Sequence, residues 1–122
     1  MVCRARDTRK AARTVAVRVF SPRSSGLLHV FVSPVPYITA TDLLGAGVDT
    51  TDFVVGGTCS EQLYGVCEAM YKPNLEAEDL FEVISQALLA GVDRDCLSGW
   101  GAIVHIITPE GVIERQLKSR KD

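Results

Sequence analysis

Cys59 is the side chain of this sequence whose type and position could most directly do chemistry. It lies in the first turn of a predicted helix, where the helix dipole can lower the pKa of a thiol. A cysteine hydrolase also needs a histidine base and an orienting acid. The sequence has two histidines, His29 and His105, and His105 lies within an apolar run that predicts a strand. The sequence therefore leaves a cysteine hydrolase centred on Cys59 as an alternative function.

The four cysteines do not have the spacing of a zinc site. Structural zinc sites use paired ligands two to four residues apart, and the sequence contains no C-x-x-C pair. The first residues are too charged for a secretory signal. Cysteines in this context are typical of reduced thiols in the cytosol or nucleus. The cysteines are Cys3, Cys59, Cys67 and Cys96.

Charge divides the chain into two parts. Residues 1–34 hold seven basic side chains and one acid, whereas residues 35–122 hold six basic side chains and fourteen acids. We interpret residues 1–35 as a basic leader that is disordered or non-native, with an organelle transit peptide as the alternative. Alternating apolar residues at 15–19 and an apolar run at 27–32 could form two short strands.

Two classes of partner are not expected. The basic leader lacks the interleaved aromatic residues of a nucleic-acid module. No apolar run approaches the roughly 20 residues that a membrane-spanning helix needs. We therefore expect neither a nucleic-acid nor a membrane partner.

From residue 36 the pattern predicts two strands, two helices and two strands. The predicted strands cover residues 37–43, 52–55, 102–107 and 112–117. The first helix starts at a capping box, with Thr58 as the cap and Glu61 three residues later, and Pro73 ends it. Asn74 is the predicted cap of the second helix. This order predicts an α+β fold with an antiparallel sheet and helices packed on one face.

Each predicted helix has one apolar stripe. In the first helix the stripe is Leu63, Val66, Cys67 and Met70. In the second helix it is Leu80, Phe81, Ile84, Ala87, Leu88 and Gly91. Acidic residues crowd the first turn of the second helix, where the positive end of the helix dipole favours them.

Several segments resemble proteasome β-type subunits. Residues 52–58 (D-F-V-V-G-G-T) resemble the strand and turn before a helix of that family, and residues 63–68 (L-Y-G-V-C-E) resemble the helix that follows. Residues 80–88 and 98–101 continue the match, which looks most like a non-catalytic member from green plants and covers residues 36–122. The resemblance implies the C-terminal part of an αββα sandwich of the N-terminal nucleophile (Ntn) hydrolase class.

The resemblance also implies roles for individual residues. Catalytic members use an N-terminal threonine with an aspartate and a lysine, for which we find no counterpart here. The family's R-D-x-x-S-G motif matches at Arg94, Asp95, Ser98 and Gly99. We expect Asp95 and Ser98 to order this loop rather than to support a nucleophile. Thr58 falls where catalytic members often place another supporting serine.

The implied function is that of a truncated, non-catalytic structural subunit of the β ring of the 20S proteasome core. Its partners would be the other α and β subunits, its process ATP- and ubiquitin-dependent protein degradation, and its location the cytoplasm and nucleus. No cofactor is expected beyond a structural magnesium ion, which related particles hold near Asp95, Ser98 and Asp122. The alternative is an incomplete or pseudogene-like fragment that does not assemble.

Overall fold

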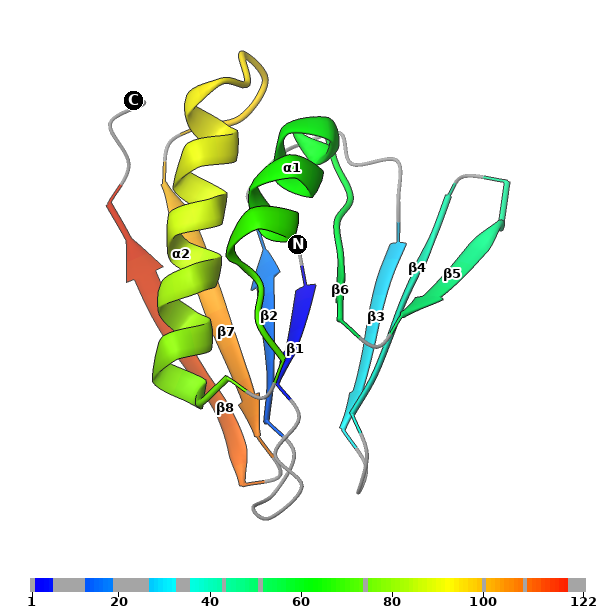
Figure 1. Ribbon diagram of the computed structural model, residues 1–122, viewed down its shortest axis with the longest axis vertical. Helices are drawn as coiled ribbons and strands as arrows, with labels where there is room; N and C mark the ends of the chain where they lie inside the picture. Colours follow the sequence, from blue (N-terminus) through cyan, green and yellow to red (C-terminus); the bar gives the residue numbers. More distant parts are fainter. Residues whose placement is uncertain are drawn as a thin grey trace.

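A computed structural model gives the fold of the chain (Figure 1). It describes residues 2–5, 13–18, 27–32, 36–42, 44–50, 52–73, 75–99, 101–108 and 110–118. The strands are β1 (Val2–Ala5), β2 (Arg13–Arg18), β3 (Leu27–Val32), β4 (Pro36–Thr41), β5 (Gly47–Thr50), β6 (Phe53–Val54), β7 (Ala102–Thr108) and β8 (Gly111–Leu117). The helices are α1 (Ser60–Met70) and α2 (Ala77–Asp93).

The described strands form two antiparallel sheets. The larger sheet has the order β6-β1-β2-β7-β8, and the smaller has the order β3-β4-β5. Strand β4 contacts β1 and β6, and β3 contacts β2, so the smaller sheet packs against the larger one. Helices α1 and α2 lie over the larger sheet, on the side away from β3, β4 and β5 (Figure 1). The described residues therefore form three layers, α-β-β, of the predicted α+β sandwich.

The main core lies between the two helices and the larger sheet. Helix α2 contributes the predicted stripe, and Leu80, Ile84 and Leu88 are fully buried. Strand β7 contributes Ala102, Val104 and Ile106, which alternate with partly exposed neighbours as a strand with one buried face requires. Full burial of each large side chain contributes about 1.5–3 kcal/mol.

At Gly91, helix α2 packs closely against the Leu63 side chain of α1. A Cβ atom at this position would lie 2.8 Å from Cδ2 and 3.0 Å from Cγ of Leu63 on α1. Leu63 is itself buried, so it has little room to move. Glycine at position 91 therefore lets α2 pack against Leu63 without a clash.

Gly91→Ala is expected to lower the free energy of unfolding by about 1–2 kcal/mol. Overpacking costs about 1–3 kcal/mol, and the better helix propensity of alanine returns up to about 1 kcal/mol. The control is Gly65→Ala in α1, where a Cβ atom would meet nothing within 4 Å. That substitution should be neutral or stabilising in urea denaturation. Equal effects of the two substitutions would contradict the close approach.

Three local predictions differ from the structure. Residues 47–50 form strand β5, which was not predicted, after a turn in which the Asp42 carboxylate accepts hydrogen bonds from the amides of Leu44 and Ala46. The N-cap of α1 is Cys59 and no side chain caps this helix, so the capping box at Thr58 is wrong. The N-cap of α2 is Glu76, and Asn74 lies outside the described residues.

The predicted basic leader contains three strands. The two short strands expected near residues 15–19 and 27–32 are confirmed as β2 and β3, and β1 was not predicted. Strand β2 pairs with β1 on one side and with β7 on the other. Strands on the two sides of the predicted boundary between residues 35 and 36 therefore pair with one another. That residues 1–35 are a separate segment stays a prediction.

Candidate functional site

Thr58, Asp95 and Ser98 form one hydrogen-bonded cluster. Oγ1 of Thr58 and Oγ of Ser98 both donate to Oδ2 of Asp95, at 2.5 Å and 2.6 Å. The two hydroxyl oxygens lie 3.1 Å apart. The other carboxylate oxygen, Oδ1, accepts a hydrogen bond from the amide of Leu97 at 3.1 Å. Asp95 and Ser98 are buried, with 6% and 7% of their surface exposed.

The packing of α1 against α2 positions this cluster. Thr58 precedes α1, whereas Asp95 and Ser98 lie in the loop that follows α2. The amide of Asp95 donates to the carbonyl of Val92, which extends the end of α2 by one turn. The side-chain amide of Gln62 on α1 donates to the carbonyl of Arg94 at 3.4 Å. These contacts tie the loop to the start of α1.

The hydrogen bonds within the loop are compatible with the loop-ordering role expected for Asp95 and Ser98, which stays a prediction. Both hydroxyls donate to the same carboxylate, and Asp95 and Ser98 are buried, so a substrate cannot reach the Ser98 hydroxyl without a change in the loop. His105 lies on the partly exposed face of β7, opposite the face that contacts the helices. Its Nδ1 is 4.0 Å from a carboxylate oxygen of Glu114 on β8. His105 is therefore not the base of a site at Ser98 or Cys59.

Thr58 is the residue whose role sequence reasoning missed. The local sequence pattern assigned Thr58 to a helix cap. Its hydrogen-bond partner, Asp95, lies 37 residues further along the chain. The family resemblance could have indicated this role, because catalytic members of the family place a supporting serine at this position. We now assign Thr58 to the Asp95 cluster instead of to the helix cap.

Cys59 does not have the properties of a nucleophile. The residue is 4% exposed and belongs to the core between the helices and the sheet. Burial raises the pKa of the Cys59 thiol, and the negative charge of Asp95 raises this pKa further. The lowering expected from the helix dipole is therefore outweighed, which argues against the cysteine hydrolase.

Cys96 is expected to react with iodoacetamide at least about ten times faster than Cys59 and Cys67 in the folded chain. Cys96 is exposed, whereas the other two are buried and react only when the structure opens. Mass mapping of alkylated peptides against time measures the three rates. In urea the rates should converge. Fast alkylation of native Cys59 would contradict this prediction and favour the hydrolase.

The side chains of Asp95 and Ser98 do not fit a magnesium ion as ligands. Both carboxylate oxygens of Asp95 accept hydrogen bonds, and the Ser98 hydroxyl donates to one of them. Asp122, the third predicted residue, lies outside the described residues. Within the described residues, no group of three or more His, Cys, Asp or Glu side chains could hold a metal ion. A magnesium ion on backbone oxygens of this loop stays a prediction.

Comparison with known proteins decides the family. The model of the family described as "Proteasome subunit" matches residues 7–107. The chain belongs to the proteasome subunit family. The match starts within the predicted leader, further towards the N-terminus than the resemblance of residues 36–122. No helix in the described part of the chain is long and apolar enough to cross a membrane.

Two similar proteins from different organisms are both named as beta type-3 subunits of the proteasome. The chain is 63% identical over 87 residues to proteasome subunit beta type-3-A of Arabidopsis thaliana, covering 71% of this chain and 43% of the relative. It is 58% identical over 87 residues to proteasome subunit beta type-3 of Saccharomyces cerevisiae, covering 71% of this chain and 42% of the relative. The predicted similarity to a β-type subunit is thus confirmed. The chain spans less than half the length of these relatives.

Proposed function

We propose that this chain acts as a non-catalytic, structural subunit of the β ring of the 20S proteasome core. The observation that carries the proposal is its 63% identity to a beta type-3 subunit. In this role the chain occupies one position in the β ring and contacts other α and β subunits. It thereby takes part in ATP- and ubiquitin-dependent protein degradation. It works in the cytoplasm and nucleus. It requires no cofactor, and backbone oxygens of the loop after α2 are the place where a structural magnesium ion could bind.

The hydrogen bonds of the Asp95 cluster support a structural role. The Thr58 and Ser98 hydroxyls are held by one buried carboxylate, so the loop after α2 is fixed to the start of α1. A fixed loop can present the same surface to a neighbouring subunit at each assembly event, which reduces the entropy lost on binding.

Co-sedimentation with the core particle tests assembly. An epitope-tagged chain is expressed in Saccharomyces cerevisiae, whose own beta type-3 subunit is 58% identical, and the lysate is separated on a glycerol gradient. We expect the tag to sediment with the peptidase activity of the particle. A tag that stays at the top of the gradient would favour the fragment that does not assemble.

A peptidase assay on the purified chain tests the absence of catalysis. We expect no hydrolysis of fluorogenic peptides above the rate without protein. Hydrolysis that Cys59→Ala abolishes would overturn the proposal in favour of a cysteine hydrolase. Hydrolysis that Cys59→Ala leaves unchanged would also overturn it, since another residue would then act as the nucleophile.

A further inference from the structure

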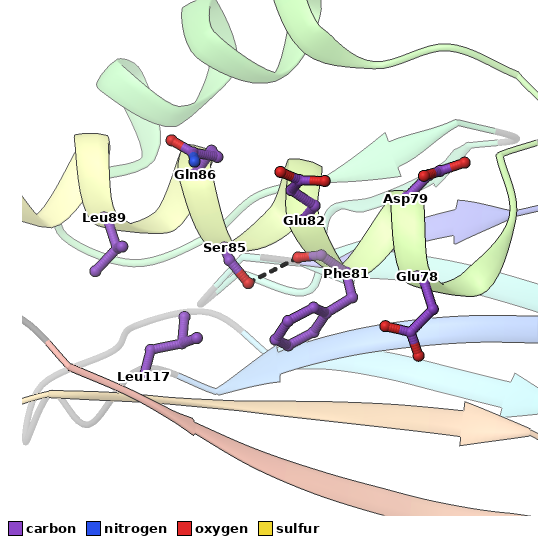
Figure 2. A pocket seen from close by; sticks show the side chains of 8 residues that line it. All are labelled: Glu78, Asp79, Phe81, Glu82, Ser85, Gln86, Leu89 and Leu117. Atoms are coloured by element: carbon purple, nitrogen blue, oxygen red, sulfur yellow. Dashed lines mark hydrogen bonds between the residues drawn. The ribbon is translucent and has the colours of Figure 1, made fainter.

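A hollow open to solvent lies between α2 and β8, outside the Asp95 cluster. Its volume is about 380 Å³ and it is open to solvent on one side. Phe81 and Leu89 of α2 and Leu117 of β8 give it an apolar floor, as Figure 2 shows. Glu78, Asp79, Glu82, Ser85 and Gln86 complete its lining. We call this surface the α2–β8 groove.

One end of the groove already holds a guanidinium group of the chain itself. Nη1 and Nη2 of Arg115 each donate to a carboxylate oxygen of Glu78 at 2.8 Å. The guanidinium carbon of Arg115 lies 4.6 Å from the centre of the Phe81 ring, which gives a cation–π contact. The charge of Glu78 is therefore compensated within the chain.

Two further carboxylates along the groove have no such compensation. Asp79 and Glu82 are exposed, and neither has an ion-pair partner among the residues that the structure describes. They stand three positions apart on α2, so they are neighbours on one side of the helix. The helix dipole accounts for an acid in the first turn, such as Asp79. It does not account for Glu82, because the dipole effect falls off beyond that turn.

We propose that the α2–β8 groove docks an arginine-bearing segment of a partner protein, with an apolar residue next to the arginine. The guanidinium pairs with Asp79 and Glu82, and the apolar side chain enters the hollow over Leu89 and Leu117. Charge complementarity selects this occupant, because a partly buried apolar floor, beside two carboxylates that have no ion-pair partner among the described residues, matches a segment that is both basic and apolar. The proposal does not depend on the proposed function.

The test measures binding of a fluorescein-labelled peptide, with two arginines each flanked by leucine, to the full 122-residue chain. Fluorescence anisotropy gives the affinity at low salt and at physiological salt. We expect weaker binding as salt rises, since exposed ion pairs are screened. A peptide with citrulline in place of arginine has the same shape without the charge, and it should bind at least about fivefold more weakly.

The matched variants change equal numbers of charges on two helices. Asp79→Asn with Glu82→Gln should weaken peptide binding about fivefold, whereas Glu61→Gln with Glu68→Gln on the exposed side of α1 should change it less than about twofold. Circular dichroism confirms that both double variants are folded. Equal binding by both double variants, or equal binding of the citrulline peptide, overturns the proposal.

Sedimentation of the unlabelled chain tests a different occupant. If the chain forms a dimer that Asp79→Asn with Glu82→Gln dissociates, the groove is occupied by a second copy and the proposal is wrong. A monomer that binds the arginine peptide supports it.

Discussion

Asp95→Ala is expected to lower the free energy of unfolding by about 3 kcal/mol. The substitution removes the acceptor of the Thr58 hydroxyl, the Ser98 hydroxyl and the Leu97 amide. Hydrogen bonds to a charged group contribute about 1.5–3 kcal/mol, and a buried donor left without an acceptor adds to the cost. Ser98 is such a donor, because only 7% of its surface is exposed. Urea denaturation followed by circular dichroism measures the change.

Asp93→Ala is the matched control for Asp95→Ala. Asp93 is an exposed aspartate at the last position of α2, two residues before Asp95. An exposed position of this kind typically changes stability by less than about 0.5 kcal/mol. Ser98→Ala should fall between the two aspartate variants, at about 1 kcal/mol, since it removes one hydrogen bond and leaves the carboxylate its other partners. Equal losses for Asp93→Ala and Asp95→Ala would show that the cluster does not stabilise the fold.

Leu88→Ala is expected to destabilise the chain by about 3–4 kcal/mol. Leu88 has no exposed surface and lies in the core between α2 and the larger sheet. Truncation removes the burial of its methyl groups and leaves a cavity, and Leu→Ala changes in protein cores cost about 2–5 kcal/mol. The same urea titration measures this loss.

Leu97→Ala tests whether the loss at Leu88 depends on burial. The Leu97 residue is 66% exposed, so truncation should change stability by less than about 0.5 kcal/mol. Comparable losses at positions 88 and 97 would mean that the packing between α2 and the sheet is loose. The midpoint should shift at an unchanged denaturant slope, because neither variant alters the area exposed on unfolding appreciably.

The regular part of the fold was predictable because its sequence pattern is strictly periodic. Leu80, Ile84 and Leu88 recur every four residues, and all three are fully buried on one side of α2. Strand β7 was predicted from its near-continuous apolar run. Such a run indicates burial on both faces, whereas the structure buries Ala102, Val104 and Ile106 and leaves the alternate residues partly exposed. Local pattern suffices where a single element has one face in the core.

Contacts between distant residues could not be predicted from local pattern. Thr58 is in the position of a helix cap, but a carboxylate 37 residues away offers its hydroxyl a charged acceptor. Residues 47–50 were not assigned to any strand from the sequence, and they form strand β5 by pairing with β4. Residues 2–5 have too little periodicity to predict β1, which forms between β2 and β6. In each case the tertiary partner outweighs the local preference.

The order of strands in the larger sheet determines when that sheet can close during synthesis. Strand β2 (Arg13–Arg18) bonds on one edge to β7 (Ala102–Thr108), which the ribosome produces far later. Until β7 emerges, the backbone amides and carbonyls along one edge of β2 have no partner strand. Bringing β2 and β7 together also closes a long loop, and the entropy lost in closing it precedes the stabilising contacts. We therefore expect a nascent chain that stops short of β7 to depend on chaperones, and folding to finish with the arrival of the β7–β8 hairpin.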